Sequence, residues 1–138
     1  MNRRTCCLTA ALGLLLAASG CGGPLVNVTG RLTYKGQPVP STYVIFNPEE
    51  EGKRASRGVT DDDGNFMLTH SKSNTGALRG RHTVTLQYHL ITEEEIGHIP
   101  PKASKELKAV IARYGDVKTS PLHYEITKNG QVVEINLE

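Results

Sequence analysis

The feature that most constrains the fold of this chain is a two-residue alternation of apolar and polar side chains. It appears in residues 25–34, 82–90, 122–126 and 131–137. Because successive side chains of a β-strand point to opposite faces, a period of two predicts half-buried strands rather than helices. The side chains expected to face inward are Val26, Val28, Leu32, Tyr34, Val84, Leu86, Tyr88, Leu90, Leu122, Tyr124, Ile126, Val133, Ile135 and Leu137. In residues 82–90 the outward set is Thr83, Thr85, Gln87 and His89.

Turn residues separate these segments. Lys35–Pro38 predicts a turn, and the prolines that follow bar a helix, so the chain reverses into a second strand near Thr42–Asn47. A less regular strand near Ser56–Thr60 leads into Asp61–Gly64 and then into Asn65–Thr69. This pattern predicts a hairpin with Gly64 at positive φ.

The last two segments are joined by Asn129-Gly130, a dipeptide typical of hairpin turns. Short strands with regularly spaced turn signals predict a mainly β fold, namely a seven-stranded antiparallel β-sandwich. The exception is residues 104–114, where apolar side chains at helical spacing precede Gly115. They predict one short helix within an insertion over 91–121. The insertion either carries function or covers a sheet edge that would otherwise aggregate.

The amino terminus has the layout of a secretory signal: two arginines, an apolar run, and small residues immediately before Cys21. Leu16–Cys21 looks like a bacterial lipobox, in which the Cys21 thiol receives a diacylglyceryl group before cleavage. We therefore expect a signal peptide over 1–20, a lipidated cysteine and tether over 21–24, and one domain over 25–138. The alternative is an ordinary signal peptide and a soluble secreted domain.

Cysteine usage favours the lipoprotein interpretation, because cleavage before Cys21 leaves one cysteine and excludes a disulfide framework within the mature chain. Lipidation would place the protein in the cell envelope, held at a membrane by its acyl chains. The residue after the cysteine is Gly22 and not aspartate. The absence of aspartate at this position resembles the pattern that directs lipoproteins to an outer membrane.

Charge argues against nucleic acid as a partner. The chain has 16 basic and 14 acidic residues, and removing the two arginines of the signal segment leaves 14 of each. Phosphate-backbone binding needs a clustered basic surface, which a balanced composition does not indicate. The chain has no tryptophan, so a stacking platform for bases or sugars is not expected either.

Candidate chemistry is sparse. Asp61, Asp63 and Asn65, together with Asp62, offer oxygen ligands to Ca²⁺, although a turn requires the same residue types for backbone reasons. The five histidines show no metal spacing, and the chain lacks a Gly-x-Ser-x-Gly elbow. We therefore expect no cofactor and no catalytic activity. A histidine, an acid and a hydroxyl that converge in the fold cannot be recognised from sequence.

Five segments follow one another along the chain in a characteristic order. They are Cys21–Pro24, Val28–Pro40, Gly58–Phe66, Gly76–Val84 and Tyr114–Leu122. In this order the chain resembles small bacterial surface lipoproteins whose mature part is a carboxypeptidase-regulatory-like, transthyretin-like domain. The resemblance implies a seven-stranded sandwich displayed on the envelope without an assigned catalytic activity, and it transfers no active-site residues.

The leading functional hypothesis is a noncatalytic, lipid-anchored envelope domain that binds or supports other surface proteins or polymers. Exposed sheet edges make strand addition the natural route to a protein partner. The alternative is a small-ligand or carbohydrate-binding module that uses loops at one end of the sandwich, around Asp61–Asn65 and Leu78–Arg81.

Overall fold

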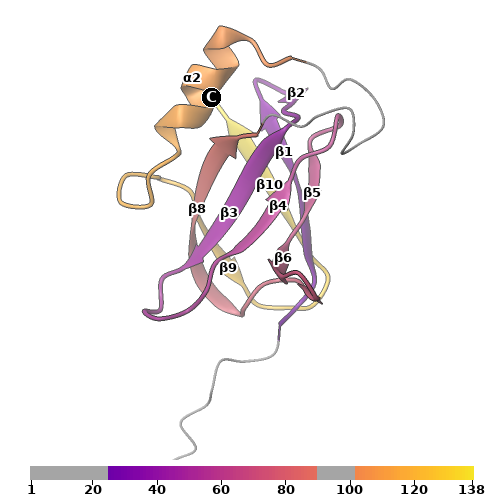
Figure 1. Cartoon of the computed structure of the whole chain (residues 1–138), viewed down its shortest axis with the longest axis vertical. Coiled ribbons are helices and arrows are strands. Elements are labelled where there is room, and N and C mark those ends of the chain that lie inside the picture. The colour runs from indigo at the N-terminus through magenta and orange to yellow at the C-terminus, as the bar shows by residue number, and fades with distance from the viewer. Residues whose placement is uncertain (1–24, 90–101) are drawn as a thin grey trace, which may run out of the picture.

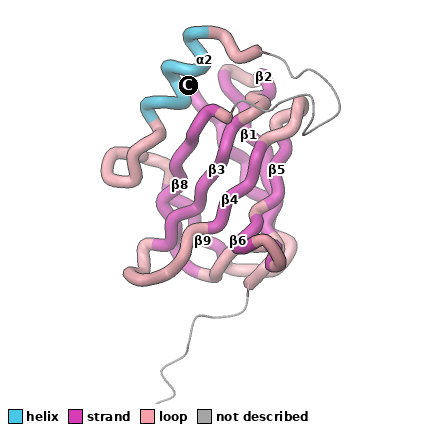
Figure 2. The backbone as a smooth tube through the Cα atoms, viewed as in Figure 1, coloured by secondary structure: helices cyan, strands magenta, loops and turns pink. Residues whose placement is uncertain are grey.

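The computed structural model describes residues 25–89 and 102–138, which form two β-sheets and one helix (Figure 1, Figure 2). The predicted signal peptide, Cys21, Leu90 and the first part of the insertion lie outside the described residues. The strands are β1 (Val28–Tyr34), β2 (Gln37–Pro38), β3 (Thr42–Pro48), β4 (Ser56–Val59), β5 (Asn65–Met67), β6 (Thr69–Ser71), β7 (Asn74–Thr75), β8 (Gly80–Tyr88), β9 (His123–Ile126) and β10 (Gln131–Leu137). The mainly β prediction is confirmed.

The smaller sheet is built around β1. On one side β1 pairs with β10 over its whole length, and on the other it pairs with β5 and then with β2. The β1–β10 pairing is parallel, whereas β2 and β5 run antiparallel to β1. The sandwich is therefore mixed, which differs from the wholly antiparallel arrangement predicted from the sequence.

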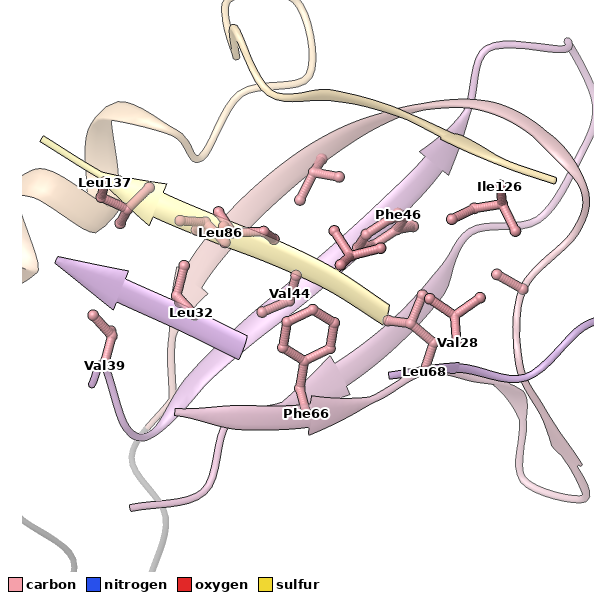
Figure 3. Packing of buried hydrophobic residues seen from close by; sticks show 14 of the residues in the cluster. Val28, Leu32, Val39, Val44, Phe46, Phe66, Leu68, Leu86, Ile126 and Leu137 are labelled. Carbon is pink, nitrogen blue, oxygen red and sulfur yellow. The ribbon is translucent and has the colours of Figure 1, made fainter. Parts of the chain in front are cut away.

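The larger sheet has the order β7-β6-β4-β3-β8-β9, and its pairings are antiparallel. Its inner face packs against the smaller sheet through one apolar core (Figure 3). Phe46 from β3 and Phe66 from β5 meet across the two sheets with their ring centroids 6.4 Å apart. Gly30 in β1 allows this packing, because a Cβ there would lie 2.4 Å from the Phe66 ring.

Both predicted hairpin turns form as turns, but neither joins two strands of one sheet. The Gly64 amide donates to the Asp61 carbonyl at 3.0 Å, and Gly64 has the expected positive φ of 78°. However, β4 belongs to the larger sheet and β5 to the smaller one. Asn129-Gly130 likewise leads from β9 in the larger sheet to β10 in the smaller sheet. Two hairpin predictions were therefore wrong, since both turns carry the chain across the sandwich.

The outer face of β8 is more buried than its alternation predicts. Thr83 and Thr85 were expected to face outward, yet they are only 7% and 5% exposed. The Asn47 side-chain amide covers this face by donating to the Thr83 carbonyl and to the Thr85 hydroxyl, each at 3.1 Å. Asn47 thus satisfies the Thr85 hydroxyl, while the Thr83 hydroxyl lies 3.5 Å from Glu49. Polar partners therefore bury two positions that the period of two places in solvent.

The predicted helix is confirmed as α2 (Lys105–Arg113), with Ser104 as its N-cap. Its apolar stripe packs on the core, where Val110 and Ile111 are buried and Leu107 and Tyr114 are half-buried. Within residues 25–89 and 102–138 no helix has both the length and the apolar character needed to cross a bilayer.

The first turn of α2 is tied to the end of β1. The Tyr34 hydroxyl donates to the Glu106 carboxylate at 2.8 Å, and the Lys35 ammonium lies 3.1 Å from the same oxygen. The Tyr34 hydrogen bond and the Lys35 charge lower the pKa of Glu106, while the pKa of Lys35 is raised by Tyr34 and Glu106. These contacts are exposed, so they orient the helix more than they stabilise it.

Candidate functional site

The acidic loop is organised as a turn. One carboxylate oxygen of Asp61 accepts the backbone amides of Asp63 and Asn65 at 3.0 and 2.8 Å. This use of Asp61 satisfies the backbone of the turn. Among the described residues no group of three or more histidine, cysteine or acidic side chains is arranged to hold a metal ion. The calcium prediction for Asp61, Asp63 and Asn65 therefore rests on the sequence pattern alone.

The two loops proposed as a shared ligand site lie at opposite ends of the sandwich. Gly64 accepts a hydrogen bond from Leu32, near the end of β1, whereas Ala77 pairs with Val26, just before the start of β1. The length of β1, about 20 Å at roughly 3.3 Å per residue, separates them. The hypothesis of one site formed by Asp61–Asn65 and Leu78–Arg81 is therefore wrong, because the chain crosses the sandwich between them.

A histidine, an acid and a hydroxyl do converge beside Leu78–Arg81. Glu49 lies 3.0 Å from His123 Nδ1 and 3.5 Å from the Thr83 hydroxyl, and the Arg81 guanidinium is 3.4 Å from its other oxygen. The Thr83 hydroxyl also meets His123 at Nδ1, at 3.3 Å. A nucleophilic triad needs the acid on one ring nitrogen and the hydroxyl on the other. Here both share Nδ1, which is the geometry of an ion-pair cluster.

His82 is the one polar side chain that enters the core without a full set of partners among the described residues. It is 1% exposed, and its Nε2 has no hydrogen-bond partner. Its Nδ1 lies 3.0 Å from the Gly80 carbonyl, an acceptor, so Nδ1 carries the proton of the neutral ring. Burial lowers the pKa of His82 below its ordinary value of 6.5.

The outer edge of β10 is unpaired within the part of the chain that the structure describes. The Leu137 carbonyl accepts from Lys35, so odd-numbered residues of β10 direct their backbone groups toward β1. Val132, Glu134 and Asn136 consequently direct theirs outward. One of these groups, the Glu134 carbonyl, accepts the Tyr124 hydroxyl at 3.2 Å.

Beside this edge the outer face of the smaller sheet is open and partly apolar. Val132, Thr29 and Met67 form one cross-strand row, in which Val132 is 64% and Met67 55% exposed. The next row brings Glu134 beside Arg31. Together these rows line a shallow hollow of about 720 Å³. Large apolar side chains grouped on an open face are a feature of interaction surfaces.

Sequence reasoning missed this surface because Met67 and Val132 are far apart in the chain and only the register brings them together. The signal that could have found it is the exposed valine of the Gln131-Val132-Val133 run, which the alternation places outside. The chain matches no protein-family model, no curated protein and no solved structure.

Proposed function

We propose that this protein is a noncatalytic, lipid-anchored domain of the cell envelope that binds an extended segment of a surface protein by strand addition to β10. The anchor is the Cys21 thiol of the lipobox, and the domain is a mixed β-sandwich of the carboxypeptidase-regulatory-like kind. The observation that carries the binding proposal is the β10 edge, which no described strand pairs, beside the Val132–Met67 row.

Several features of the edge support this assignment. The outward backbone groups of Val132 and Asn136, together with the Glu134 amide, lie along a seven-residue strand and offer a template to an added strand. An added strand would replace the Tyr124 hydroxyl at the Glu134 carbonyl. Main-chain hydrogen bonds would supply affinity, and the exposed Val132 side chain would contact a neighbouring partner side chain on the same face of the sheet. No edge residue is a proline, and the one charge, Glu134, gives the edge little protection against pairing.

Site-specific photo-crosslinking in the native envelope tests the binding proposal. A benzoylphenylalanine at Val132 should give one discrete protein adduct, and the same probe at the exposed Gln87 of β8 should not. Glu134→Pro should abolish the adduct, because it removes an outward amide without removing a β1–β10 hydrogen bond. Glu134→Ala is the matched control. Adducts of equal yield at both probe positions, or an adduct that survives the proline, would exclude strand addition at β10.

The anchor is tested separately by the intact mass of the mature protein. We expect the chain from Cys21 plus a diacylglyceryl group, and no lipid mass in Cys21→Ala. An unmodified chain would exclude lipidation and leave a diffusible binding protein.

A further inference from the structure

A second surface lies on the outer face of the larger sheet, where β4 and β6 pair. It is a groove of about 430 Å³ whose lining includes Arg54, Arg57 and Lys72. The register sets Arg57 opposite Thr69, so residues from two neighbouring strands contribute to one wall. Balanced overall composition conceals this cluster, because its members are separated in the chain by up to 18 positions (72 − 54).

The three cations lack a neutralising carboxylate in the part of the chain that the structure describes. Within the described residues none of them has a carboxylate within ion-pair distance, and no aspartate or glutamate lines the groove. All three side chains are exposed. Like charges gathered on paired strands repel one another, which a bound anion would relieve. Of the acidic residues that precede Arg54, Glu49 pairs with Arg81 and Glu50 with Lys53.

The groove also supplies orientation and hydroxyl donors. The Arg57 guanidinium lies over the Tyr43 ring, 5.7 Å from its centroid, which fixes one cation. Thr69 and Ser71 place hydroxyls in the same lining. Two guanidinium forks, an ammonium and hydroxyls present more donors and charge than a single carboxylate needs. They suit the several oxygens and the negative charge of a phosphate group.

We infer that this groove binds phosphate groups. The site is separate from β10 and does not rest on the strand-addition proposal. Phosphate could come from a free or polymer-borne ligand or from a lipid headgroup. The groove lies toward the end of the sandwich where the described chain begins, because β6 pairs with β7 and Thr75 of β7 contacts Asn27 at 3.5 Å (Figure 1). A headgroup near an anchored Cys21 would thus be within reach.

The test is a calorimetric titration of the purified mature protein, in neutral detergent, with inorganic pyrophosphate. We expect saturable binding that weakens about tenfold or more in the double variant Arg57→Gln, Lys72→Gln. The control Lys118→Gln, Lys128→Gln removes the same charge outside the groove and should weaken binding less than about twofold. Arg57→Lys should retain more affinity than Arg57→Gln, because it keeps the charge and loses only the planar fork.

The source of the phosphate is distinguished by a second titration with soluble short-chain phosphatidylglycerol, using short-chain phosphatidylcholine, which is zwitterionic and has no net charge, as the counterpart. Phosphatidylglycerol that competes with pyrophosphate assigns the site to a headgroup, whereas pyrophosphate binding alone assigns it to a free or polymer-borne phosphate. Unfolding midpoints establish that each variant is folded. The proposal is overturned if pyrophosphate shows no saturable binding up to about 20 mM, a concentration far above a specific phosphate site's range. Equal weakening in both double variants would overturn it as well.

Discussion

The two sheets differ in whether a strand edge is covered by another segment of the chain. In the larger sheet, β9 pairs only with Gly80–Thr83, and the rest of the β8 edge is covered by the segment that carries α2. There the Val84 amide donates to Leu122 and the Leu86 amide to Tyr114, at 2.7 and 3.0 Å. In the smaller sheet, β10 has no such cover among the described residues.

The difference shows what the insertion does. Its described part closes the hydrogen bonds of an otherwise open strand, which favours the edge-covering interpretation over a functional loop. Among the described residues β10 is a seven-residue edge, whereas the other edge strands, β2, β5, β7 and β9, have two to four residues each. The contrast therefore supports β10, and not β8, as the docking edge.

The largest loss of stability should come from removing the side chain through which α2 contacts the core. Ile111, 1% exposed, anchors α2 on the core, and Ile111→Ala should lower the free energy of unfolding by about 2–5 kcal/mol. Val132→Ala on the open edge should change it by less than about 0.5 kcal/mol. Denaturant titration of both variants measures the difference. Equal losses would mean that β10 is covered in solution.

Acid should lower the free energy of unfolding because β8 carries the buried side chain of His82. The unfolded chain takes up a proton on His82 near pH 6.5, whereas burial holds the folded-state pKa lower. His82 therefore contributes no pH dependence above about 6.5, and stability falls as the pH drops from there toward the folded pKa. Denaturant titrations between pH 7 and 5 should show this fall, and it should flatten in His82→Leu. A fall of the same steepness in His82→Leu would assign it to other groups; His123→Gln serves as the exposed control.

The cap of α2 should have a smaller effect. The Ser104 hydroxyl accepts the Leu107 amide at 3.1 Å, and Ser104→Ala should cost about 1 kcal/mol. Hydrogen exchange provides a local readout, since the Leu86 amide should exchange faster while the β10 amides that bond β1 are unchanged. Ser104→Asp should restore protection. Uniform acceleration in both sheets would show that the cover does not act locally.

The smallest effect should follow from the exposed tie between α2 and β1. Lys35→Gln removes the ion pair with Glu106 but leaves the Tyr34 hydrogen bond. We expect no measurable change in the unfolding midpoint at physiological salt, because exposed pairs are screened and cost side-chain entropy to hold. A clear loss of stability would show that the helix depends on this contact.

Local periodicity predicted the elements but not their partners. The strand around Val28 and Leu32 and the helix around Val110 and Ile111 follow directly from side-chain spacing. The two turns were recognised, including the positive φ of Gly64. Their strands were assigned to hairpins because a turn signal says that the chain reverses. It does not say whether the next strand pairs with the last one or crosses to the facing sheet.

The Val132–Met67 row and the basic groove could not be predicted from the sequence for a related reason. Val132 and Met67 become neighbours only through their shared pairing with Thr29, and Arg57 comes near Lys72 only through the β4–β6 pairing. Burial of Thr83 also depends on a distant partner, the Asn47 amide. Each of these features depends on long-range register, which residue spacing within one segment does not encode.

The parallel ladder between β1 and β10 has a consequence for how the protein folds. It joins nearly the first and last described residues, as the Thr33–Asn136 hydrogen bond shows with a separation of 103 positions. Closing so long a loop is entropically costly, and folds dominated by distant pairings form slowly. β1 therefore cannot pair with β10 until Gln131–Leu137 has been synthesised and, if the chain is exported, translocated. Until then both the strand that follows the tether and the inner face of the larger sheet remain uncovered, so a chaperone would be needed most at that stage.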